Sequence, residues 1–276
     1  MTEMELYRLW CEKAVDDPDL QTELNSIADD EEAIKDRFYR DLEFGTGVNR
    51  IKSDKFAKEA AAVLAANGIR VYIYPELMPT PMLSWAVRYL KCQAGIVVTA
   101  SHNPAKYNGY KVYGEDGCQI TLDVANTVIG KINDVPMFGG AKVMSFDEGI
   151  QSGMIRLIEQ EVIDAYLEKV SEQGIHTDLV ADSGLKVVYT PLNGTGNKPV
   201  RAILKKIGIK EVTVVPEQEN PDGNFPTCPF PNPEIKEALA KGLELCETVK
   251  PDLLLATDPD CDRVGIAVPD PDGNYV

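Results

Sequence analysis

A short apolar run that ends in a polar loop, within Gly95–Lys111, constrains the fold most. Residues 96–99 read Ile-Val-Val-Thr, and such a β-branched run is typical of a buried strand. Ser101 follows it, just before an Asn-Pro pair that predicts a turn. In an open parallel sheet the carboxyl ends of the strands face the ligand crevice, so this hydroxyl would lie at the crevice mouth with His102 and Lys111. The residues alone leave open a polar loop with no chemistry.

Strand and helix patterns alternate along the chain, which predicts an α/β protein. We expect two βαβ-type domains with mixed, mainly parallel sheets flanked by helices. The polar stretch 173–184 suggests a boundary, so the expected parts are a helical arm at 1–41, one domain at 42–178 and another at 179–276. The expected helices include 54–67 with Ser53 as N-cap, 80–91, 121–133, 154–172, 198–207 and 234–248, and the expected strands are 69–74, 95–100, 185–190, 212–215 and 253–257.

A second apolar strand pattern, Leu253–Thr257, also ends in a polar loop, and this loop carries Asp258, Asp260 and Asp262. Carboxylates at alternate positions of an extended segment point to one side. Three negative charges at such short distances repel one another unless a cation binds between them. Oxygen ligands favour Mg²⁺ or Ca²⁺ over zinc, and the spacing does not fit an EF-hand. The alternative is a solvated acidic turn.

Composition excludes several classes of protein. The chain has 44 Asp and Glu against 28 Lys and Arg, a net charge of −16, which disfavours nucleic acid and anionic membranes as partners. The acidic start is unlike a signal peptide, and no run is long and apolar enough for a membrane helix. The six cysteines lack a Cys-x-x-Cys pair, so reduced thiols and a cytoplasmic location are expected.

The stretches Thr99–Pro104 and Tyr107–Lys111 resemble the phosphoserine loop of the α-D-phosphohexomutases, the family of phosphoglucomutases and phosphomannomutases, and most closely its long-chain branch. The resemblance implies that Ser101 carries a phosphoryl group, that Lys111 or His102 manages the proton, and that Asn103 contacts phosphate or substrate. It also implies an isomerase that interconverts hexose 1-phosphate and hexose 6-phosphate through a bisphosphate, with glucose 1,6-bisphosphate as activator and sugar phosphates as ligands.

The carboxylate loop resembles the metal loop of the same family. By this resemblance, Asp258, Asp260 and Asp262 would bind Mg²⁺ together with a phosphoryl oxygen on Ser101, and Arg263 would contact the phosphoryl group. An aspartyl phosphatase is the alternative, because Asp258-x-Asp260 after a strand also resembles the haloacid dehalogenase motif. A further alternative is a catalytically incompetent or phosphopentomutase-like relative. The preferred sugar and the oligomeric state are left open.

Two departures from the family pattern matter. Residues 42–46 resemble the opening motif of the family. In the family this motif leads into a turn whose arginine helps hold the phosphoserine loop. Here Gly47-Val48-Asn49-Arg50 follows instead, so Arg50 cannot be equated with that arginine. We therefore expect the first domain to lack its first βα unit. The family's sugar-reading and distal-phosphate domains also have no counterpart in the sequence, so we expect these 276 residues alone not to turn over as a mutase.

The glycine-containing loop 191–197 has two interpretations. Its glycines could let backbone N–H groups approach a phosphate. A tight turn before the helix at 198–207 is the simpler interpretation, and the spacing does not match a dinucleotide-binding fingerprint.

Overall fold

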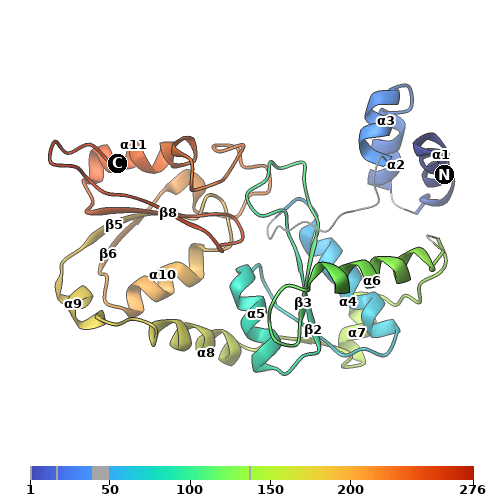
Figure 1. The fold of residues 1–276 in the computed structure, drawn as a ribbon, viewed down its shortest axis with the longest axis horizontal. Coiled ribbons are helices and arrows are strands. Elements are labelled where there is room, and N and C mark those ends of the chain that lie inside the picture. The colour runs from blue at the N-terminus through green and yellow to red at the C-terminus, as the bar shows by residue number, and fades with distance from the viewer. Residues whose placement is uncertain (1, 17, 39–49, 137) are drawn as a thin grey trace. The chain divides into compact units, whose positions relative to one another are not determined.

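The computed structural model describes residues 2–16, 18–38, 50–136 and 138–276. The opening motif at 42–46 and the turn that follows it therefore lie outside the described residues, and the expectation placed on them stays a prediction. The described residues form two compact units, one drawn from within 1–44 and 133–141 and the other from within 45–132 and 142–276 (Figure 1).

The first unit is helical, as its sequence predicts. It contains α1 (Glu3–Lys13), α2 (Pro18–Ser26) and α3 (Glu31–Phe38). Thr2 and Glu5 form a capping box at the start of α1. Apolar side chains of this unit pack into a small core made of Tyr7, Leu24, Ile27 and Ile34. How this unit packs on the rest stays a prediction.

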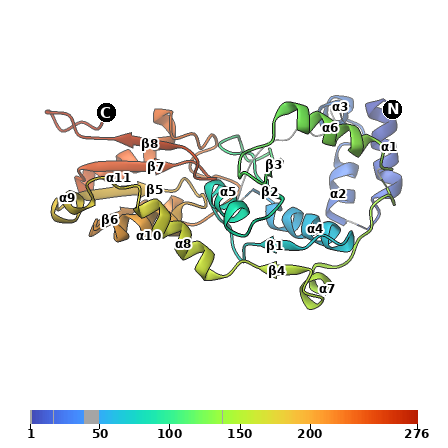
Figure 2. The same cartoon turned by 60° about the horizontal axis from the view of Figure 1, so that its bottom comes forward.

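The amino-terminal half of the second unit contains two separate two-stranded sheets (Figure 2). One sheet pairs β1 (Val71–Ile73) with β4 (Ile155–Leu157) in parallel, and the other pairs β2 (Ala94–Val98) with β3 (Tyr110–Gly114) in antiparallel. A hollow of about 370 Å³ is lined by residues of both β1 and β2. The helices of this half are α4 (Ser53–Ala66), α5 (Thr80–Tyr89), α6 (Leu122–Asn133) and α7 (Phe146–Gln151).

The antiparallel pairing of β2 with β3 corrects one expectation. The strand before Ser101 was expected to belong to a parallel sheet, but the loop that carries Ser101 joins the two strands of an antiparallel hairpin. The Thr99 N–H donates to the Gly109 carbonyl at 2.9 Å and continues the ladder past the last strand residues. The side chain of Asn108 donates to the Ile51 carbonyl and to Ser53 Oγ, so the returning arm of the loop is tied to the start of α4.

Two local predictions need correction. Lys52, at φ 63°, is the N-cap of α4, and Ser53 is instead the first helical residue. The helix expected over 154–172 begins only at Gln160 (α8, Gln160–Ser171), because Ile155 lies in β4 and is buried against Ala61 and Ala65 of α4. The polar stretch 173–184 contains a short helix, α9 (Thr177–Asp182), and its role as a domain boundary stays a prediction.

The carboxyl-terminal half of the second unit forms a four-stranded sheet in the order β6-β5-β7-β8. Strands β5 (Lys186–Thr190), β6 (Glu211–Val214) and β7 (Leu253–Thr257) are parallel, and β8 (Val264–Ala267) pairs antiparallel with β7. Figure 1 shows this sheet between α10 (Asn197–Lys206) and α11 (Ala240–Val249). The core between the sheet and α11 consists of Val188, Val215, Leu239, Cys246, Leu254, Ala256 and Ala267.

The long crossing between β6 and α11 is irregular but ordered, as its proline content predicts. It contains two short 3-10 turns, Pro216–Gln218 and Lys236–Leu239. Gln218 is fully buried and bonds to Thr190 and Thr227, which anchors the crossing to the sheet. Across the residues that the structure describes, every helix is too short or too polar to span a bilayer. The six cysteines, all of them described, are free thiols.

Candidate active site

Ser101 lies in the hairpin loop and is held in an unusual conformation. Its φ is +49°, a left-handed backbone that costs a non-glycine residue about 1–2 kcal/mol. The residue is only 7% exposed. Its Oγ donates a hydrogen bond to Asp258 Oδ2 at 3.2 Å, and its N–H donates to Thr99 Oγ1 at 3.4 Å. The hydroxyl thus faces the carboxylate loop of the second half.

Asp258, Asp260 and Asp262 form one cluster, with a carboxylate oxygen from each within 4.8 Å of the others. The sequence predicts their convergence, but from an extended segment. The structure uses a tight turn instead, in which the Cys261 N–H donates to the Asp258 carbonyl at 2.9 Å and Cys261 has φ 57°. Asp258 and Asp260 are buried, whereas the Asp262 side chain is 29% exposed.

The cluster fits a bound cation. Burial raises the pKa of Asp258 to about 9, and the neighbouring Asp260 and Asp262 carboxylates act in the same direction. Burial and Asp260 also raise the pKa of Asp262. Asp260 Oδ1 is buried and has no hydrogen-bond partner among the described residues. An orphaned carboxylate oxygen beside two other carboxylates is a donor set of the kind Mg²⁺ takes.

Lys111 lies against the same cluster. Its Nζ is 3.4 Å from Asp260 Oδ2 and 3.3 Å from Asp262 Oδ2, and its side chain is 12% exposed. Burial by itself lowers the pKa of Lys111, but Asp260 and Asp262 outweigh this effect and hold the pKa above its usual value. The ammonium group is therefore protonated at neutral pH, which suits a proton donor or a phosphate contact and not a base.

His102 and Arg263 also lie beside Ser101. His102 Nδ1 is 3.2 Å from Ser101 Oγ, and the Arg263 guanidinium donates to the His102 ring. Arg263 Nε is 3.6 Å from Glu234 Oε1. Asn103, which the sequence predicts to contact phosphate or substrate, has an exposed side chain, and its backbone N–H donates to the Ala100 carbonyl.

Sequence reasoning missed several residues that build the site. Arg50, which the sequence did not allow to be equated with the loop-holding arginine of the family pattern, is 3% exposed, and its guanidinium donates to backbone carbonyls of the Ser101 loop. Thr80 and Thr99 both donate hydroxyl hydrogen bonds to Asp260 Oδ2, at 3.3 and 3.4 Å. The Thr80 N–H also donates to the Asp260 carbonyl at 2.9 Å. In the sequence, Arg50 is merely an arginine before α4 and Thr80 a threonine at the start of a helix, so neither stands out as a site residue.

The glycine-containing loop supports the carboxylate turn. Thr195 donates both its N–H and its hydroxyl to the Pro259 carbonyl, at 2.9 and 3.0 Å. A Cβ on Gly194 would lie 2.5 Å from Pro259 Cα, so only glycine allows this approach. The N–H groups of Asn193 and Gly194 are bonded to the Gln218 and Pro191 carbonyls. These contacts favour the tight-turn interpretation over phosphate binding.

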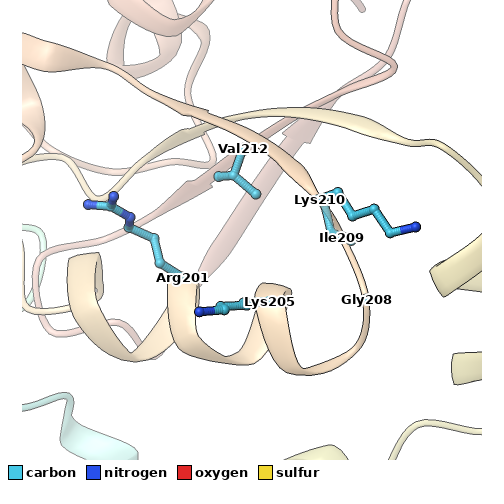
Figure 3. Close-up of a pocket in the computed structure, with 6 residues that line it drawn as sticks. All are labelled: Arg201, Lys205, Gly208, Ile209, Lys210 and Val212. Atoms are coloured by element: carbon cyan, nitrogen blue, oxygen red, sulfur yellow. The ribbon is translucent and has the colours of Figure 1, made fainter.

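The second half also has a basic hollow of about 510 Å³. Figure 3 shows the side chains that line it. The hollow is lined by Arg201, Lys205, Gly208, Ile209, Lys210 and Val212. These residues lie where α10 ends and β6 begins. Gly208, Ile209 and Lys210 come before the amino end of β6, whereas Asp258 follows the carboxyl end of β7. Because β5, β6 and β7 are parallel, this side of the hollow lies at the opposite end of the strands from the carboxylate cluster. The hollow is separate from the Ser101 site.

Comparison with known proteins gives the family. Residues 49–136 match the model described as phosphoglucomutase/phosphomannomutase, alpha/beta/alpha domain I, and residues 164–273 match the one for domain II. The chain belongs to the α-D-phosphohexomutase family. The first match covers the Ser101 loop and the second covers the carboxylate turn.

Relatives and a solved structure agree with this assignment. The chain is 38% identical to a phosphoglucomutase of Staphylococcus epidermidis, covering 80% of the chain and 40% of the relative. It is 39% identical to a phosphoribomutase of Saccharomyces cerevisiae, covering 80% and 38%. A Thermus thermophilus structure described as a phosphomannomutase has a TM-score of 0.69 at 27% identity, covering 84% of this chain and 49% of that one. The chain thus spans about 40% of the length of these curated relatives.

Proposed function

We propose that this chain supplies the phosphoserine and metal-binding part of a phosphohexomutase, which interconverts hexose 1-phosphate and hexose 6-phosphate. The observation that carries the proposal is the hydrogen bond between Ser101 Oγ and Asp258, because it joins the two motifs across 157 positions of sequence. A nucleophilic hydroxyl against a carboxylate cluster is what a phosphoryl-transfer site requires. Membership of the family and the names of the relatives support the same class of reaction.

The proposed transfer breaks the bond between phosphorus and Ser101 Oγ and forms a bond from phosphorus to a sugar hydroxyl. The proton of that hydroxyl needs a base, and His102 is better suited than Lys111, since Lys111 stays protonated. The second phosphate of the resulting bisphosphate then returns to Ser101. Bound at Asp258, Asp260 and Asp262, Mg²⁺ would neutralise charge on the group in transfer.

The other charged side chains would hold the phosphoryl group. Arg263 lies against His102 and is 36% exposed, so its guanidinium is available to a phosphate on Ser101. The ammonium group of Lys111 offers a second positive charge. Such positioning and charge compensation are most of what phosphoryl transfer needs from a protein.

Phosphate mapping tests the proposal. The chain is incubated with Mg²⁺ and glucose 1,6-bisphosphate and digested, and the phosphate is located by mass spectrometry. We expect acid-stable phosphate on Ser101, which Ser101→Ala abolishes and which the exposed-serine control Ser26→Ala retains. Base-labile phosphate on Asp258 or Asp260 would instead establish the aspartyl phosphatase. Loading with glucose, mannose and ribose bisphosphates under the same conditions ranks the sugars.

A further inference from the structure

Arg50 fixes the backbone of the Ser101 loop. Its Nη1 donates to the Pro104 carbonyl at 2.9 Å, and its Nη2 donates to the Ser101 carbonyl at 2.6 Å and to the Ala100 carbonyl at 3.4 Å. One planar guanidinium therefore ties together three carbonyls in the first half of the loop between β2 and β3. This matters because Ser101 is held at φ +49°, a conformation that persists only when the surroundings determine it.

Phe225 covers the Arg50 guanidinium from the other half of the unit. The Arg50 Cζ atom lies 4.6 Å from the centre of the Phe225 ring. Phe225 is 1% exposed and has φ 47°, so the crossing between β6 and α11 holds this side chain in a fixed position. The ring is thus one contact through which the crossing reaches the Ser101 loop.

A buried guanidinium needs this kind of partner. Burial lowers the pKa of Arg50 to about 10, although the nearby Asp260 and Asp258 charges act in the opposite direction. Its Nε is buried and has no hydrogen-bond partner among the described residues. The faces of a guanidinium cannot form hydrogen bonds, and an aromatic ring compensates a desolvated cation through its negative face. Removing the ring leaves the charge less compensated and free to tilt away from the three carbonyls.

We propose that Phe225 is a positioning residue for Ser101, which acts by holding the Arg50 guanidinium against the carbonyls of the Ser101 loop. The crossing between β6 and α11 thereby sets the geometry of a hydroxyl that lies in the other half of the unit. Phe230 of the same crossing contacts the His102 ring edge to face, with centroids 5.5 Å apart, so the crossing also touches the residue that follows Ser101. The importance of this geometry for transfer rests on the proposed function.

Hydrogen–deuterium exchange of the complete 276-residue chain tests the positioning directly. Phe225→Met keeps an apolar side chain of similar length and removes the aromatic face. We expect amides of residues 100–103 to exchange at least about tenfold faster than in the unsubstituted chain, with no comparable change in α11. The matched control Phe56→Met alters a phenylalanine that is 40% exposed on α4, and it should leave the loop unchanged.

Arg50→Lys tests the link between the two residues. A lysine keeps the positive charge but cannot bond to three carbonyls from one plane. We expect the same faster exchange in the loop. The double variant with Phe225→Met should exchange little faster than either single variant, because the two substitutions remove the same interaction. An unchanged loop in either single variant, or effects that multiply in the double variant, would overturn the proposal. Arg50→Lys also decides the question if Phe225→Met does not fold.

A phosphate-loading measurement separates this proposal from the proposed function. In Phe225→Met, the maximal rate of Ser101 loading from glucose 1,6-bisphosphate should fall at least about tenfold, while the half-saturating concentration stays within about twofold. If the unsubstituted chain never loads Ser101, the proposed function fails, and the exchange data still decide the positioning. If loading is normal in Phe225→Met, the proposed function stands and the positioning role is wrong.

Discussion

Replacing Asp260 by asparagine tests the carboxylate cluster as a magnesium site. In the folded chain Asp260 Oδ2 accepts from Thr80, Thr99 and Lys111, and an asparagine oxygen can still accept these bonds. The other oxygen, Oδ1, is buried without a partner among the described residues, and it becomes an amide nitrogen that cannot bind a cation. The substitution therefore removes a metal ligand and one negative charge with little change in shape.

The expected stabilisation by Mg²⁺ follows from the linkage between ligand binding and folding. A ligand at 100 times its dissociation constant stabilises a protein by about 2.7 kcal/mol, which for a domain of 150–250 residues raises the Tm by about 5–11 °C. We expect Mg²⁺ to raise the melting temperature of the unsubstituted chain by such an amount, and that of Asp260→Asn by less than about 2 °C. Without Mg²⁺ the variant should be no less stable, since it relieves repulsion among three close carboxylates.

Thermal unfolding followed by circular dichroism, with and without saturating Mg²⁺, measures both effects. Asp272→Asn is the matched control, because this exposed aspartate lies in the same half and outside the cluster. The control should keep the full rise with Mg²⁺. A full rise in Asp260→Asn would refute the reasoning and place the metal elsewhere.

Four further outcomes are expected. Because the pKa of Asp258 is raised from 3.8 to about 9, Mg²⁺ affinity measured by calorimetry should increase with pH up to about 9. The metal-free native state binds more protons than the unfolded state in that window, so its stability should fall as pH rises, by up to about 1.4 kcal/mol per unit. Gly194→Ala, whose Cβ would lie 2.5 Å from Pro259 Cα, should cost about 1–3 kcal/mol in urea unfolding, whereas Gly130→Ala, with no atom within 4 Å, should cost nothing. Ser101→Gly should be about 1–2 kcal/mol more stable than Ser101→Ala in the same assay, because only glycine relaxes the φ of +49°; equal stabilities would show that this backbone is unstrained.

Local patterns in the sequence were sufficient for most elements and for the chemistry of the two loops. The β-branched run before Ser101 and the apolar run before Asp258 are both strands, as predicted. Short segments that could form either element were less predictable. Ile155–Leu157 was expected to be helical and is a strand, because its state depends on burial against α4 and pairing with β1, which lies far away in sequence.

Several site residues could not be predicted because their role is a long-range contact. Arg50 has no motif of its own, and its importance comes from carbonyls 50 or more positions away and from the ring of Phe225. Thr80 is an ordinary residue at a helix start until Asp260 lies beside it, 180 positions later. Neither contact leaves a periodic pattern or a spacing that the sequence alone displays.

The sequence by itself determined which groups are available, namely a hydroxyl and a carboxylate trio that each follow a buried strand. Strand propensity and turn chemistry act over a few neighbouring residues, so they can be read locally. The tertiary structure alone decided that Ser101 faces Asp258, that Lys111 is held between Asp260 and Asp262, and that the Ser101 loop closes a hairpin. These arrangements depend on how two halves of the unit pack and compensate buried charge, and such coupling between distant residues is a property of the folded chain.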